Sequence, residues 1–293
     1  MYKFEYNIPY TKSENCILIS ARDWVDGSQS SLIKRTGVTN IQKVLDVGYT
    51  EVFKTHKVSE GDTVLISKAS SQIAYLKPFD IPNNIGKFAN VHWMQVLGRV
   101  SELTSSGIEL FYNKVLLKEV KVNNSLLIME DDKKLYEVLK VGPHNFTDEW
   151  EEIPMEVEEG MSVLVNDGSL TKVELTDGIY YITEENNVIG YFEGEDLVLD
   201  KFIPLSTRVL IKPYEKEVSD GGLYNPLVDL DIEDISEVYD RDMFKVVNVG
   251  EKITSVKKDD IISVNRDSLS HICYNRESYF VANSDEYIRG RYV

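Results

Sequence analysis

Short apolar segments separated by polar turns follow one another along the whole chain. The segments lie at 16–19, 43–47, 63–66, 91–100, 114–117, 162–165, 171–175, 178–183, 188–192, 208–212, 244–249, 261–264, 271–274, 278–282 and 287–293. Turn signals such as Asp177-Gly178 separate them at intervals of about ten residues. No amphipathic stretch is long enough for a helix of more than three turns. The pattern predicts an all-β protein made of small barrels or sandwiches.

One part of this pattern occurs three times. An apolar strand ends in glycine at Gly48, Gly142 and Gly250, a polar excursion follows, and a second strand is entered through a turn. The turn residues Gly61, Gly160 and Asp259 are spaced 99 residues apart. Self-similarity at a fixed long period is typical of duplicated units. The spacing predicts three domains.

The predicted domains cover residues 15–100, 108–193 and 205–293, after an N-terminal arm at 1–14. Residues 101–107 are the most linker-like segment, and 193–204 join the second domain to the third. Aromatic and polar residues partly alternate in the arm, which is either an extra edge strand or a segment that docks on a neighbour.

The charge balance limits the kinds of partner. There are 32 Lys+Arg against 49 Asp+Glu, a net charge of −17. A phosphate backbone needs clustered cations, so we expect no nucleic acid. No apolar run approaches the ~20 residues of a membrane helix, and residues 1–10 lack the apolar core of a signal peptide. Cys16 and Cys273 fit free thiols better than a disulfide, which points to the cytoplasm or a particle assembled there.

Residues that carry chemistry are scattered. His56, His92, His144 and His271 form no cluster at metal-ligand spacing. The acidic clusters at 148–152 and 229–234 lack the glycine and spacing of a calcium loop. No G-x-G-x-x-G follows a strand, which argues against a dinucleotide-binding dehydrogenase. We therefore expect no enzyme, no cofactor, no metal and no small-molecule substrate.

The predicted units resemble GroES, the chaperonin-10 fold. In the second unit the similar segments are 113–118, 139–142, 157–165, 177–182 and 187–192. The third unit is similar at 208–212, 246–250, 259–264 and 278–281, and the first at 43–48 and 58–66. The resemblance implies an all-β chain of three tandem small GroES-like β-barrels with long loops.

The resemblance also implies candidate partner-binding residues. In GroES a loop after the first strand inserts an apolar tripeptide into the chaperonin. The matching positions are Leu32 and Ile33, then Leu126, Leu127 and Ile128, and finally Gly221, Gly222, Leu223 and Tyr224. In the second unit we rank a strand packed on its own core above chaperonin docking. In the third, a glycine turn in an acidic loop and a partner contact are equally supported.

Two classes of function follow from these expectations. The first is a non-enzymatic structural or assembly protein with protein partners, in particular a phage virion component such as an auxiliary capsid protein assembled in the host cytoplasm. The second is a cytoplasmic co-chaperonin that caps a chaperonin ring. Three barrels per chain do not divide a seven-fold ring, and the three loops differ, so we favour the first. Its expected contacts are the arm and the loops at 22–40, 119–136 and 213–242.

Overall fold

The protein is all-β, as predicted. The computed structural model describes residues 16–20, 41–47, 58–67, 79–80, 87–120, 127–128, 133–147, 151–166, 169–193, 197–214, 243–264, 269–274, 277–282 and 288–292. In these ranges the chain forms strands and four 3-10 turns and has no α-helix. The turns are η1 (Trp93–Gln95), η2 (Ser105–Gly107), η4 (Glu185–Asn187) and η5 (Leu199–Lys201).

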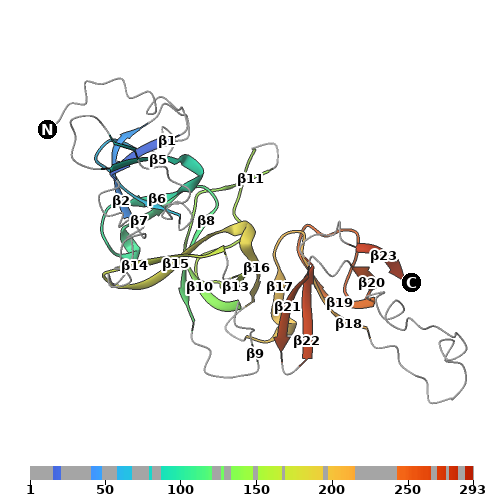
Figure 1. Cartoon of the computed structure of the whole chain (residues 1–293). Helices are drawn as coiled ribbons and strands as arrows, with labels where there is room; N and C mark the ends of the chain where they lie inside the picture. Colours follow the sequence, from blue (N-terminus) through green and yellow to red (C-terminus); the bar gives the residue numbers. More distant parts are fainter. Residues whose placement is uncertain are drawn as a thin grey trace, which may run out of the picture. The chain divides into compact units, whose positions relative to one another are not determined.

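The strands form three sheets of seven and one separate hairpin (Figure 1). The first sheet has the order β4 (Phe79–Asp80), β5 (Lys87–His92), β1 (Cys16–Ser20), β2 (Ile41–Val47), β3 (Thr63–Ile66), β6 (Val96–Val100), β7 (Ile108–Leu110). The central sheet has the order β14 (Thr171–Leu175), β15 (Gly178–Glu184), β8 (Lys114–Glu119), β10 (Lys133–Val141), β13 (Ser162–Asn166), β16 (Val188–Phe192), β17 (Phe202–Pro204).

The third sheet has the order β9 (Leu127–Ile128), β21 (Leu269–Tyr274), β22 (Glu277–Ala282), β18 (Val209–Pro213), β19 (Met243–Val249), β20 (Ile261–Val264), β23 (Ile288–Tyr292). The hairpin pairs β11 (Asn145–Phe146) with β12 (Glu152–Ile153). Most predicted strands agree with these bounds to within one or two residues. The strands β7 and β17 were not predicted, because each is three residues long and lies in or beside a segment interpreted as a linker.

The three sheets share their strand order and their irregularities. Leaving out β7, β9 and β17, the remaining six strands follow one another in the same chain order in each sheet. The pairs β3–β6, β13–β16 and β20–β23 each contain a register shift at the same place. Glycine stands at the same register in all three, at Gly98, Gly190 and Gly290. The pairs β1–β2 and β18–β19 also share one register shift.

The predicted closure into barrels is not confirmed. Among the described residues each seven-stranded sheet has two edge strands, and none of the three sheets closes on itself. A barrel would require the two edge strands of a sheet to pair with each other. In the first sheet β6 pairs instead with β7, and in the central sheet β16 pairs with β17. Each of these two sheets is therefore extended by the strand that comes next in the chain.

The chain divides into two compact units. Unit 1 comprises residues 1–119, 137–160 and 169–186, and unit 2 comprises 120–136, 161–168 and 187–293. The predicted domain boundaries remain a prediction. Each unit contains an apolar cluster that joins strands of two predicted domains. In unit 1, Leu65 and Leu97 pack with Leu116 and Ile182, and in unit 2, Leu164 and Phe192 pack with Leu210 and Val281.

The turn residues spaced 99 residues apart adopt one conformation. Gly61, Gly160 and Asp259 have positive φ values of 92°, 88° and 72°. Their backbone N–H groups donate to the carbonyls of Val44, Val138 and Val246 at 2.9, 2.8 and 2.9 Å. Glycine adopts positive φ without steric cost, and aspartate is among the side chains that tolerate it best. The sequence spacing therefore corresponds to a recurring turn geometry.

The segment 101–107, interpreted as a linker, is fixed by hydrogen bonds in unit 1. The Ser105 N–H and hydroxyl donate to the Asp177 carboxylate at 2.9 and 2.7 Å. The Thr176 hydroxyl and N–H donate to the Leu103 carbonyl, and Lys140 Nζ donates to the carbonyls of residues 106 and 108. The Ser105 N–H holds the pKa of Asp177 below its usual value. This segment is therefore an ordered junction.

Candidate functional site

A hollow of about 280 Å³ lies within unit 1. It is lined by Trp93, Met94, Tyr112, Asn113, Lys114, Asn145, Phe146, Thr147, Glu184 and Asn186. These residues come from four places in the chain: the turn after β5, the start of β8, the β11 strand and the end of β15. The hollow combines an aromatic wall with a polar floor.

The aromatic wall is built on two unusual pieces of backbone. The 3-10 turn that carries Trp93 and Met94 begins at His92, whose Nδ1 accepts from the Met94 N–H at 3.4 Å. Tyr112 has a positive φ of 51°, and a Cβ on Gly142 would lie 1.7 Å from its carbonyl oxygen. Only glycine at 142 leaves room for this backbone, which places the Tyr112 ring against Trp93.

The rings are packed edge to face or tilted. Trp93 and Tyr112 lie 5.1 Å apart with a T-shaped arrangement, and Tyr112 and Phe146 lie 5.6 Å apart. His144 lies 4.9 Å from Phe146. Such pairs stabilise beyond the apolar area that they bury. Burial raises the pKa of Tyr112. Met94 remains half exposed at 52%, so the wall has an adaptable apolar rim.

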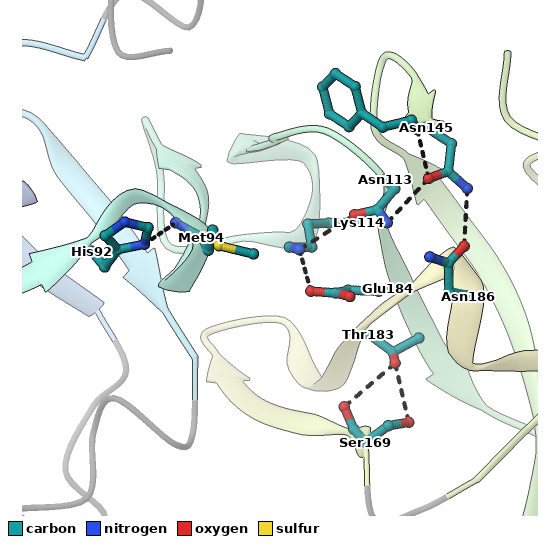
Figure 2. Close-up of polar contacts among 10 residues, drawn as sticks. His92, Met94, Asn113, Lys114, Asn145, Ser169, Thr183, Glu184 and Asn186 are labelled. Atoms are coloured by element: carbon teal, nitrogen blue, oxygen red, sulfur yellow. Dashed lines mark hydrogen bonds and ion pairs between the residues drawn. The ribbon is translucent and has the colours of Figure 1, made fainter. Parts of the chain in front are cut away.

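The polar floor is a chain of hydrogen bonds that begins at a buried lysine (Figure 2). Lys114 is 4% exposed, and its Nζ lies 2.6 Å from the Glu184 carboxylate and 3.3 Å from the Asn113 amide oxygen. The Asn113 amide donates to Asn145 at 3.2 Å, and Asn145 donates to Asn186 at 3.1 Å. A buried ammonium needs such a partner, because an unpaired buried charge is costly.

Glu185 stabilises the polar floor through hydrogen bonds to its carboxylate. It is 2% exposed and follows β15 in η4. One carboxylate oxygen accepts from the N–H groups of Glu156 and Val157 at 2.7 and 2.9 Å, and the other accepts from Asn145 at 2.6 Å. This single side chain ties β15 to the β11 strand and to the segment after β12.

The hollow combines polar, charged and apolar groups. Amide groups offer donors and acceptors, the Lys114–Glu184 pair offers both charges, and the rings offer apolar contact. Among the residues that the structure describes, no three His, Cys, Asp or Glu side chains lie together as a metal site would require. His92 and His144 lie against the rings of Trp93 and Tyr112 respectively, and each has a polar neighbour, at Met94 and Glu152. His271 lies near Ser278.

Of the residues predicted to bind a partner, the structure describes Leu127 and Ile128, and neither lines this hollow. Leu127 and Ile128 form β9, whose backbone pairs antiparallel with β21, Ile128 opposite Cys273 and Leu127 opposite Tyr274 (Figure 1). This strand belongs to the third sheet and not to the sheet of its own predicted domain. The other predicted positions, Leu32, Ile33, Leu126, Gly221, Gly222, Leu223 and Tyr224, lie outside the described residues.

Sequence reasoning missed the hollow. The sequence indicated Asn113 and Lys114 only as part of the segment 113–118 that resembles GroES. A run of residues cannot indicate a site that gathers positions from 93 to 186. Cys273 is a half-buried free thiol. None of the described residues forms a helix with the length and apolar character required to span a membrane.

Comparison with known proteins identifies part of the chain. The model of the Cpn10 family, "Chaperonin 10 Kd subunit", matches residues 107–192. This range contains β8, β10, β13, β14, β15 and β16, and most of the lining of the hollow. A GroES-like domain is therefore present at 107–192, which confirms the resemblance for this part of the chain. No curated protein matches the chain.

Proposed function

We infer that the chain is a non-enzymatic assembly protein in which three tandem GroES-like units form a scaffold for contacts with other proteins. The observation that carries this proposal is the recurrence of one strand order and one register in three sheets, of which only the central one falls in the matched family range. Duplicated units that stack on their neighbours form an extended surface suited to binding.

Apolar contacts between neighbouring sheets support the scaffold proposal. Leu65 of the first sheet packs with Leu116 of the central sheet, and Leu164 of the central sheet packs with Leu210 of the third. The segment 101–107 is hydrogen-bonded to Asp177. The hollow beside Trp93 supplies an aromatic wall and an amide floor, a combination that protein interfaces favour. Half-exposed Met94 at its rim is the first position to test for a partner contact.

A second candidate is a co-chaperonin, favoured by the family match at 107–192. A capping subunit needs an apolar loop that is available to the chaperonin. In the matched domain the backbone of Leu127 and Ile128 is engaged in pairing with β21. Strand pairing competes with insertion into a second protein, so this observation favours the scaffold over the cap.

Mass photometry of the full chain, alone and with a chaperonin ring and nucleotide, separates the two proposals. We expect the scaffold protein to leave the ring uncapped. Nucleotide-dependent capping that is lost in Leu127→Ser and Leu223→Ser would establish the co-chaperonin function and refute the scaffold. Ile179→Ser, a change at an exposed residue outside the predicted loops, is the matched control.

The finer proposal, a phage virion component, comes from the sequence argument alone. It is tested by quantitative mass spectrometry of purified particles from cells that produce this chain. A fixed copy number per particle supports it. Absence from particles, with the chain abundant in the lysate, refutes it and leaves the scaffold proposal intact.

A further inference from the structure

Two short strands are held on the outer edge of a preceding sheet. The strand β7 pairs with β6, with Leu110 opposite Gly98, and β17 pairs with β16, with Pro204 opposite Gly190. Both pairs are antiparallel and three residues long, and their registers coincide. The chain therefore contains two examples of one docking geometry.

Glycine makes this docking possible. A Cβ on Gly98 would lie 2.4 Å from the carbonyl oxygen of Glu109, in β7. A Cβ on Gly190 would lie 2.5 Å from the carbonyl oxygen of Ile203, in β17. Any side chain at either position would push the docked strand away. Glycine at this register therefore marks an edge on which another backbone lies close.

The strand β23 carries the same glycine. Gly290 pairs with Ser263 as Gly98 pairs with Leu65 and Gly190 with Leu164. The strand β23 is the last in its sheet, and no described strand lies on its outer edge. Glycine weakens a strand interior, so its presence here calls for the explanation that holds at the other two edges.

In the first sheet a charge pair accompanies the glycine, whereas at the same register of the central sheet Tyr191 stands opposite Ile203. Arg99, next to Gly98, pairs with the carboxylate of Glu109 in the docked strand. Glu109 is flanked by Ile108 and Leu110, which are 2% and 6% exposed. Arg291 stands at the register of Arg99, and Arg289 precedes Gly290. In a chain with a net charge of −17, this edge is suited to an acidic residue between two apolar ones.

The corresponding segment of a second copy of the chain suits this edge less well than an acidic segment does. Ile108 and Phe202 begin the docked strands seven residues ahead of Val115 and Val209, and Tyr10 stands at the same distance ahead of Ile17. At the register of Glu109, the segment Tyr10-Thr11-Lys12 of another copy would place the uncharged Thr11 opposite Arg291. It would therefore lack the cross-strand charge pair that Arg99 forms with Glu109.

The outer edge of β23 is better suited to a single added strand than to a further GroES-like unit stacked on the third sheet. Leu65 and Leu164 lie in the apolar clusters that join neighbouring sheets. Ser263 stands at their register in the third sheet. A stacked unit would lose this apolar contact, whereas a docked strand is held by main-chain hydrogen bonds.

We propose that the outer edge of β23 binds an extended segment of a partner protein, in which an acidic residue lies between two apolar residues, by antiparallel strand addition at Gly290. The inference rests on the proposed function, since it supplies a partner contact for an assembly protein. It adds the chemical class of the segment and the edge that receives it.

The probe is a capped, fluorescent peptide copying residues 105–112, SSGIELFY, titrated with the full chain by fluorescence anisotropy. The comparison peptide, SSGIKLFY, carries lysine in place of the glutamate. We expect the acidic peptide to bind and the lysine peptide to bind about fivefold more weakly, the effect of about 1 kcal/mol for a cross-strand charge pair. Arg291→Glu should reverse this preference, and Gly290→Val should weaken both peptides by about tenfold or more.

Lys172→Glu, on the edge strand β14, is the control and should leave binding unchanged. Gly290→Val can also disturb folding, so its thermal unfolding is measured as well. The peptide preference of Arg291→Glu tests the proposal independently of Gly290→Val. Equal binding of the two peptides, or no binding at about 1 mM, the weak end of measurable affinity, overturns the proposal. Self-association abolished by Gly290→Val would also overturn it, by making a second copy the occupant. Ring capping refutes the proposed function whatever the peptides do, whereas peptide failure without capping refutes only this inference.

Discussion

The buried carboxylate of Glu185 provides a sharp test of how the GroES-like domain is held together. In Glu185→Ala, the N–H groups of Glu156 and Val157 and the side-chain amide of Asn145 all lose their acceptor. A buried donor left without a partner costs about 1–3 kcal/mol. Because the three donors are neighbours and their effects are not additive, we expect the free energy of unfolding to fall by about 3–5 kcal/mol.

Glu185→Gln separates geometry from charge. Its amide oxygen can still accept from the two backbone N–H groups, but its NH₂ would face the Asn145 amide donor, so we expect a smaller loss of about 1–2 kcal/mol. Urea unfolding followed by tryptophan fluorescence and circular dichroism measures both variants, since Trp93 lies in the same unit. Glu159→Gln, at an exposed carboxylate, should change stability by less than about 0.5 kcal/mol. A loss below about 1 kcal/mol in Glu185→Ala would refute the reasoning.

Three further predictions address the junctions and turns. Gly98→Ala should lower the free energy of unfolding by about 2–3 kcal/mol, because its Cβ would lie 2.4 Å from the Glu109 carbonyl oxygen; urea unfolding with a loss under about 1 kcal/mol would contradict this. Asp259→Ala should cost about 1 kcal/mol because φ is 72°, whereas Asp259→Gly should change stability by less than about 0.5 kcal/mol; equal stabilities would show that the turn does not require positive φ. The Ser105 N–H lowers the pKa of Asp177, so Asp177 stabilises the fold above its unfolded pKa of about 4 and loses this contribution as the pH falls through its lower folded pKa. Asp177→Asn should therefore weaken the pH dependence of stability in acid, and an unchanged acid profile in thermal melts would contradict that role.

Local pattern was sufficient for most strands because apolar runs bounded by turns are a short-range property. Residues 63–66, 171–175, 188–192 and 261–264 form strands with the predicted bounds. The spacing of Gly61, Gly160 and Asp259 predicted a recurring turn, because glycine and aspartate are residue types that tolerate the positive φ found there. The GroES resemblance at 107–192 followed from the order of these local features.

Long-range pairing decided what local pattern could not. Three residues are too few for an alternating pattern, so β7 and β17 exist only because β6 and β16 offer them an edge. Leu127 and Ile128 pair with β21, which lies more than a hundred residues away in sequence. The hollow beside Trp93 needs four separate segments, held by a network that ends at Glu185.

The chain by itself therefore determined its all-β character, its turns and its periodicity, because these depend on residue type and near neighbours. Only the tertiary structure decided which edges are occupied, which carboxylate is buried and that none of the sheets closes in the described part of the chain. Those outcomes depend on main-chain hydrogen bonds between distant strands, and such bonds leave little trace in the side chains. The exception is glycine, because at Gly98 and Gly190 it records the close approach of another backbone.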